Sequence, residues 1–111
     1  MANTCIVVAN EPRAYRETLA AALQELRSHL EVICIEPDDL DAKVSHYSPR
    51  LVLCSRLTEA VKTCCDAWIL LYPNRENRAV ISIAGRQTVV TNIEFPHVLS
   101  VIDELEPQLS T

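Results

Sequence analysis

Five cysteines are the most reactive side chains in this 111-residue sequence, and two of them, Cys64 and Cys65, are adjacent. A vicinal pair can form a strained redox disulfide or bind a soft metal ion through its thiolates. No CxxC spacing or neighbouring histidine accompanies the pair, and structural zinc sites normally need further cysteine or histidine ligands. We therefore interpret both residues as reduced cysteines of a buried helix face, and keep cysteine oxidation as an alternative.

Ser55 is a second candidate, because it directly follows the apolar run Leu51–Cys54. The carboxyl ends of parallel strands are where α/β folds place their ligand sites. Ser55 could therefore accept a phosphoryl group from a serine kinase, although serine is also a common helix cap or turn residue. Arg56 could pair with an anion there, but a solvated loop charge is the simpler interpretation.

The acidic and histidine residues give weaker signals. Asp38, Asp39 and Asp41 could suggest a cation site, but acidic residues are also favourable at a helix N-terminus. No Ser–His–Asp or Cys–His grouping is visible, so we interpret the histidines as solvated or capping residues. They are His29, His46 and His97.

Composition excludes several classes of function. Gly85 is the only glycine, so neither a GxxxxGK[ST] loop nor a GxGxxG turn for nucleotide phosphates can be written. The net charge is −5 and the ten Lys and Arg residues are scattered, so we expect no nucleic-acid binding. No apolar stretch approaches the length of a membrane span, and residues 1–4 do not begin a signal peptide. We expect a cytoplasmic protein without membrane contact, in which Cys5, Cys34 and Cys54 are buried thiols.

Apolar runs and amphipathic stripes alternate along most of the chain. Continuous apolar runs predict strands at 5–9, 32–35, 51–54 and 68–71, each buried on both faces. Between them, stripes at 15–30, 40–47 and 57–65 predict helices. Asn10 is the predicted N-cap of the first helix, and Arg16 belongs to its polar, solvent-facing side. This alternation indicates βαβ units and a parallel sheet.

The pattern changes after the fourth predicted strand. The next strand, 79–84, follows too closely for a helical crossover and should run antiparallel to its predecessor. Gly85 and Arg86 then predict a two-residue type II′ turn with glycine at the first central position. A last strand at 88–91 and a helix over 95–105 complete a single domain spanning 1–111.

Several of these segments resemble the response-regulator receiver family. The run CIVVANEP at 5–12 and the Arg-Glu-x-Leu pattern at 16–19 resemble the opening of such a domain. The run RLVLCS at 50–55 stands where the family has DLVLLD, and the last helix also corresponds. The resemblance covers most of the chain. It implies an α/β fold, a flavodoxin/CheY-like three-layer sandwich with a central parallel sheet of order 2-1-3-4-5. An antiparallel hairpin near residues 79–92 takes the place of the fourth helix.

The family's chemistry, as the resemblance implies it, is Mg²⁺-assisted transfer of a phosphoryl group to an aspartate. Matched by position, the metal-binding acids fall on Ala9 and Asn10, and sliding the strand by one residue brings in Glu11. Serine stands at the acceptor position, tyrosine at the hydroxyl position and Thr91 or asparagine near the lysine position. The degenerate phosphorylation-pocket positions are Ala9, Asn10, Glu11, Ser55, Tyr72 and Asn92.

These changes predict a pseudo-receiver, a non-enzymatic signalling or protein-interaction module that has lost phosphotransfer. We expect no Mg²⁺ and no other cofactor. One alternative is a receiver-like switch with an atypical input: phosphorylation of Ser55, cysteine oxidation or a small ligand. A small α/β enzyme is a further alternative, for which no nucleophile–base or metal constellation is visible.

Loss of the fourth helix would leave one face of the sheet without a helical cover. Exposed apolar surface of this kind is often buried by another chain. We therefore expect a homodimer or a protein partner to contact the hairpin and the last helix. The candidate interface residues are Val80, Ser82, Gly85, Arg86 and Val89.

Overall fold

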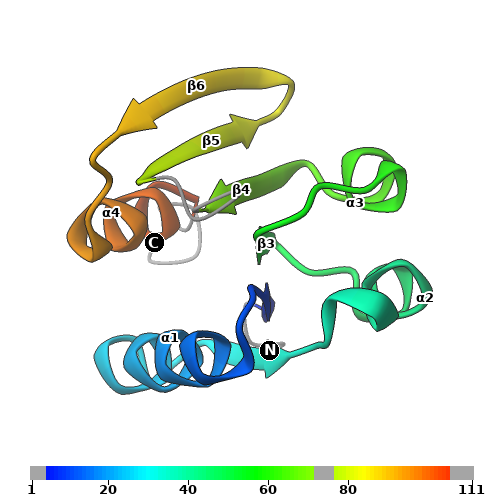
Figure 1. Ribbon diagram of the computed structural model, residues 1–111, viewed down its shortest axis with the longest axis horizontal. Coiled ribbons are helices and arrows are strands. Elements are labelled where there is room, and N and C mark those ends of the chain that lie inside the picture. The colour runs from blue at the N-terminus through cyan, green and yellow to red at the C-terminus, as the bar shows by residue number, and fades with distance from the viewer. Residues whose placement is uncertain (1–4, 72–76, 106–111) are drawn as a thin grey trace.

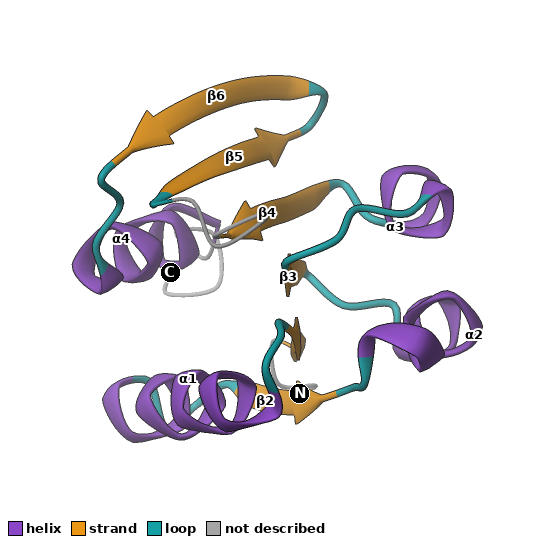
Figure 2. Cartoon of the chain, in the orientation of Figure 1, coloured by secondary structure: helices purple, strands orange, loops and turns teal. Residues whose placement is uncertain are grey.

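The computed structural model describes residues 5–71 and 77–105, which form a mixed α/β structure around one six-stranded sheet (Figures 1 and 2). The strands are β1 (Cys5–Ala9), β2 (Glu31–Cys34), β3 (Leu51–Cys54), β4 (Ala67–Leu71), β5 (Arg78–Ile83) and β6 (Arg86–Thr91). The helices are α1 (Arg13–Leu26), α2 (Leu40–Tyr47), α3 (Glu59–Cys64) and α4 (Phe95–Leu105), and a 3₁₀ turn at Pro37–Asp39 precedes α2.

The strand order is β2-β1-β3-β4-β5-β6. Strands β1 to β4 are parallel to one another, β5 is antiparallel to β4, and β6 is antiparallel to β5. The predicted antiparallel hairpin is confirmed. The predicted all-parallel five-strand order 2-1-3-4-5 is not the observed order, because a sixth strand is added and β5 runs opposite to the other five strands. The link from Leu71 to Arg78 is shorter than the dozen or so residues that a parallel crossover needs.

Helices cover both faces of the sheet (Figure 1). Under α1 and α4, the even-numbered side chains of β1 and the odd-numbered ones of β3 and β4 form one core, with Leu53 and Ile69 fully buried. Under α2 and α3, the alternate side chains form a second core that includes Val7, Val52 and Trp68. This division explains why the central strands are continuous apolar runs, since all their residues except the partly buried Cys5 and Leu70 are buried on one side or the other.

The first helix is shorter than predicted. It ends at Leu26, where the backbone N–H of Arg27 donates to the Leu23 carbonyl at 2.8 Å. Leu30, predicted as the last residue of the stripe, lies outside the helix but is still buried at 2% exposure. Leu30 is apolar because it packs into the core from the segment after the helix. Periodicity alone does not distinguish such a residue from one inside the helix.

The hairpin face toward α2 and α3 is less covered than the rest of the sheet. Those helices lie over the β1–β4 part, and among the described ribbons Figure 1 shows no helix on that side of β5 and β6. Val89 is 61% exposed there and Val80 is partly buried. Ser82, a predicted interface residue, is only 4% exposed because it lies opposite Trp68 in the β4–β5 pair.

The turn between β5 and β6 differs from the prediction. Ile83 pairs with Arg86, so the central residues are Ala84 and Gly85 and not Gly85 and Arg86. Both have positive φ, +50° for Ala84 and +84° for Gly85. This is the type I′ pattern, which requires positive φ at both central positions, whereas type II′ requires it only at the first. Gly85 therefore occupies the second position, and Ala84 adopts a left-handed conformation that alanine disfavours.

Replacing Ala84 with asparagine is expected to raise the free energy of unfolding by about 0.5–1 kcal/mol, because asparagine tolerates positive φ and Asn-Gly is the preferred type I′ pair. The backbone N–H of Ala84, which donates to the Asp66 carbonyl at 2.8 Å, is retained. Urea unfolding measures the change. Gly85→Ala is the matched control and should destabilise through backbone strain, since nothing lies within 4 Å of an added Cβ. Equal stability of Ala84→Asn and the parent chain would contradict the type I′ geometry.

The cysteines divide into buried and exposed groups, and only part of the predicted burial is confirmed. Cys54 and Cys65 are buried, Cys5 is intermediate, and Cys34 and Cys64 are exposed. Cys34 belongs to β2, which lies at the edge of the sheet. Cys64 lies at the end of α3, so only one residue of the vicinal pair faces the core.

Candidate functional site

The carboxyl ends of β1 and β3 lie side by side, because Ala9 is in register with Cys54. The residues that follow these strands therefore meet. The Ser55 hydroxyl oxygen accepts a hydrogen bond from the backbone N–H of Glu11 at 3.1 Å. The structure thus brings together two of the predicted pocket positions, and it gives Ser55 the role of joining two strand ends.

Asn10 is fully buried, with 0% exposure. Its Nδ2 donates to the Leu71 carbonyl at 3.2 Å, so its side chain links the end of β1 to the end of β4. Its Oδ1 has no hydrogen-bond partner among residues 5–71 and 77–105. The prediction that Asn10 caps α1 is wrong, since Pro12 occupies the N-cap position and no side chain caps that helix.

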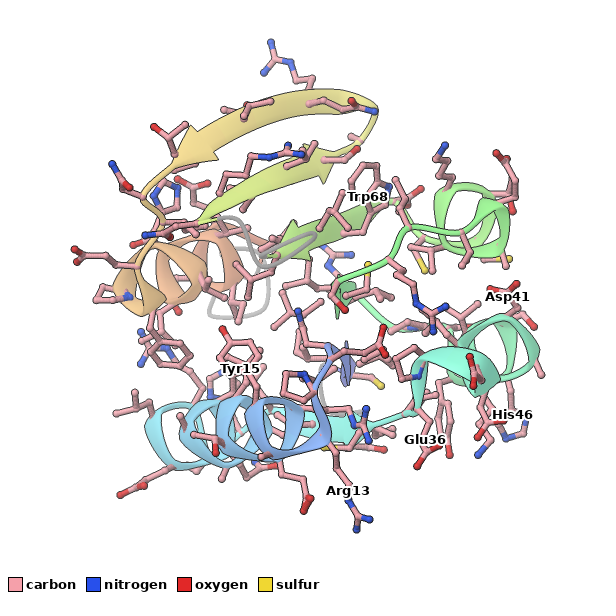
Figure 3. All side chains as sticks on the ribbon, viewed as in Figure 1. Arg13, Tyr15, Glu36, Asp41, His46 and Trp68 are labelled. Atoms are coloured by element: carbon pink, nitrogen blue, oxygen red, sulfur yellow. The ribbon has the colours of Figure 1, made fainter. Side chains whose placement is uncertain are left out.

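Arg16 lies against the same strand end. It is 6% exposed, its NH1 donates to the Asn10 carbonyl at 3.3 Å, and its NH2 lies 3.9 Å from Glu36 Oε1. Figure 3 shows Glu36 in the segment between α1 and α2. Sequence reasoning placed Arg16 on the solvent side of α1, because helical periodicity does not show that a polar position in the first turns faces the end of a strand.

Arg56 is ion-paired and is not a free loop charge. Its Nε lies 3.0 Å from Glu11 Oε1 and its NH2 lies 3.1 Å from Asp38 Oδ1. The hydrogen bond to Asp38 and the nearby Glu11 carboxylate raise the pKa of the Arg56 guanidinium above its usual value. All three side chains are more than half exposed, so solvent and salt screen these pairs. The pairs fix the loop after β3 against the ends of β1 and β2.

Two of the carboxylates near these strand ends, those of Glu11 and Asp38, are paired with Arg56. The nearby Asp41 lines a groove of about 360 Å³ together with Asp38 and Arg56. Mg²⁺ requires several hard oxygen ligands in near-octahedral arrangement. Within the described ranges, no group of three or more His, Cys, Asp or Glu residues is placed to hold a metal ion.

The remaining pocket positions do not join the site. Ala9 is buried at 1% exposure in the core under α2 and α3. Tyr72 lies outside the described residues. Asn92 follows β6, three strands from β3, a lateral separation of about 14 Å at the usual strand spacing. The resemblance places the lysine at the end of the strand beside β4. That strand, β5, is antiparallel, so it begins near the carboxyl end of β4 and ends at the opposite side of the sheet. Asn92 instead adopts positive φ of 54°.

A larger groove of about 660 Å³ lies at the other end of the parallel strands, where they begin. Its lining includes Cys5, Tyr47, Arg50, Cys64 and Leu105. Burial and the Glu31 carboxylate raise the pKa of the Cys5 thiol, which disfavours the reactive thiolate. The Cys5 thiol of this groove is therefore poorly suited to act as a nucleophile.

Comparison with protein-family models, with curated proteins and with solved structures finds no match to this chain. Among the residues that the structure describes, no helix has both the length and the apolar character needed to span a membrane.

Proposed function

We propose that this chain is a non-catalytic protein-interaction module of receiver-like type, which acts on a partner by contact and does not accept a phosphoryl group. The observation that carries the proposal is the network at the strand ends. Ser55 stands where the resemblance places the acceptor aspartate, and its oxygen holds the Glu11 N–H. The adjacent Arg56 guanidinium is ion-paired with the carboxylates of both Glu11 and Asp38.

The architecture supports the same proposal. Parallel strands in the order β2-β1-β3-β4, with helices on both faces, are compatible with a flavodoxin-like sandwich. The antiparallel hairpin stands where a receiver would have its fourth helix and fifth strand. A receiver-like scaffold with a changed strand-end site and an open hairpin favours contact over chemistry. The Ser55 hydroxyl also favours this reading over serine phosphorylation, because its oxygen is already engaged in joining two strands.

Incubation with acetyl phosphate and Mg²⁺ is expected to leave the intact mass unchanged, because no carboxylate stands at the acceptor position. A phosphorylatable receiver domain treated in parallel confirms that the reagent is active. Ser55→Ala is the matched variant. A phosphoryl adduct on the parent chain that disappears in Ser55→Ala would contradict the proposal and support the atypical switch. An adduct that persists in Ser55→Ala would place an acceptor elsewhere and would also contradict it.

A further inference from the structure

Strand β6 forms one edge of the sheet, and within the described part of the chain only β5 pairs with it. Natural edge strands usually carry a lysine, a proline, an inward-pointing charge or a bulge that prevents pairing with other chains. The sequence of β6, RQTVVT, has four β-branched residues and one charge, which is at its first position. Val89 at its centre is 61% exposed. This edge is therefore suited to accept another strand.

The register shows which backbone groups face outward. Ile83 and Arg86 flank a two-residue turn, so they form a hydrogen-bonded pair. Hydrogen-bonded and non-hydrogen-bonded positions alternate along an antiparallel pair. Gln87, Val89 and Thr91 therefore direct their backbone N–H and C=O groups away from β5, toward the open edge.

We propose that a second copy of this chain pairs antiparallel along β6, with Val89 opposite Val89 of the second copy. The inference rests on the proposed contact function and names its partner. A two-fold axis at an outward-facing residue makes the pairing self-complementary, because each Val89 both donates to and accepts from its counterpart. Gln87 of each copy then lies opposite Thr91 of the other.

Charge is compatible with this register. Arg86 lies opposite Asn92 of the second copy, and Glu94 follows two residues later on an exposed position. The residue opposite each Arg86 is therefore uncharged, and no like charges stand directly opposite each other. The pairing also brings two copies of the exposed Val89 together beside Val80, on the hairpin face that no helix covers in Figure 1. This row of valines would be removed from water.

Two double variants of the full chain test the register. In Gln87→Lys/Thr91→Glu, the pairing places Lys and Glu opposite each other twice per dimer. In Gln87→Glu/Thr91→Glu, it places two glutamates opposite each other twice. Both variants place the glutamate at position 91 opposite Arg78 of the same chain, so this contact within the hairpin is the same in both. Position 87, which differs, lies opposite the uncharged Ser82. Sedimentation velocity is expected to show a dimer dissociation constant about ten- to a hundredfold larger for the like-charged variant.

Val89→Pro is the second test. Because the Val89 N–H faces outward, proline at this edge position is compatible with the hairpin but removes the central donor. Circular dichroism is expected to show that the variant keeps the fold of the parent chain, and sedimentation velocity is expected to show a monomer. A parent chain that stays monomeric at high micromolar concentration would overturn the inference, as would double variants that dimerise equally. Neither result affects the acetyl phosphate experiment, so failure of this interface is distinguishable from failure of the proposed function.

Discussion

Replacing Asn10 with aspartate is expected to lower the free energy of unfolding by about 3 kcal/mol near neutral pH. The side chain is fully buried, and its Nδ2 donates to the Leu71 carbonyl at 3.2 Å. An aspartate carboxylate has no N–H to donate to the Leu71 carbonyl, and its negative oxygens would face that carbonyl oxygen. The charge would also be removed from water. The Arg16 guanidinium, which contacts the Asn10 carbonyl, offsets part of this cost.

The effect depends on pH in a defined direction. Burial disfavours the charged form, so the folded pKa of the introduced carboxyl should rise above its unfolded value of about 3.9. The loss of stability should therefore grow as pH rises above that value, and shrink as the carboxyl becomes protonated and can donate to Leu71. Urea titrations of the variant and the parent chain at acid and neutral pH measure this difference.

Ser55→Asp is the matched control, because an aspartate there remains partly exposed, can still accept from the Glu11 N–H and lies next to Arg56. It should cost much less than Asn10→Asp. Equal costs for the two variants, or an Asn10→Asp chain as stable as the parent, would show that this strand end is hydrated and open. Such a result would mean that this strand end can hold a hydrated carboxylate, as the metal-binding acidic pair of a receiver requires.

The second large effect is alkaline destabilisation through Cys54. Burial, with a smaller contribution from the nearby Cys65, raises the pKa of the Cys54 thiol from 9.0 to about 12. Below pH 9 the thiol is protonated in both states, and the contribution to stability is fully present. Between pH 9 and about 12 only the unfolded state ionises, so stability should fall by about 4 kcal/mol over the full range.

Cys54→Ala isolates this contribution. The variant is less stable at neutral pH because it leaves a cavity. Its stability should nevertheless fall less steeply above pH 9 than that of the parent chain. Cys65, whose pKa burial raises to about 11, adds a loss of the same sign in both proteins, so most of its contribution cancels in the comparison. Parallel stability curves for the two proteins would show that Cys54 is accessible to water.

The sequence predicts the central strands well because burial on both faces leaves a simple signal. The bounds of β1 and β3 coincide with the apolar runs at 5–9 and 51–54. The reversal at β5 also follows from chain length alone, since a short link excludes a helical crossover. The juxtaposition of Glu11 and Ser55 follows from the same strand register.

Other features depend on tertiary contacts that no local pattern contains. Arg16 has the spacing of a solvent-facing residue, yet the end of β1 buries it. Cys34 lies in an apolar run but on an edge strand, so it is exposed. The predicted type II′ turn is wrong, because the sequence allows the single glycine at either central position and only the Ile83–Arg86 pairing puts it at the second. Alanine disfavours positive φ, so the sequence does not predict the left-handed conformation of Ala84.

The position of β5 and β6 also bears on the order in which the sheet assembles. Their pairing spans only residues 78–91 and closes through a two-residue turn, whereas β1 reaches β3 through the pair Ile6–Leu51. Loop-closure entropy favours the local pair, and hairpins form within microseconds, faster than distant strands meet. An edge strand that forms early is available to another nascent chain before the rest of the sheet closes. Under the proposed β6 pairing, folding and association would overlap in time, and the folding kinetics would depend on chain concentration.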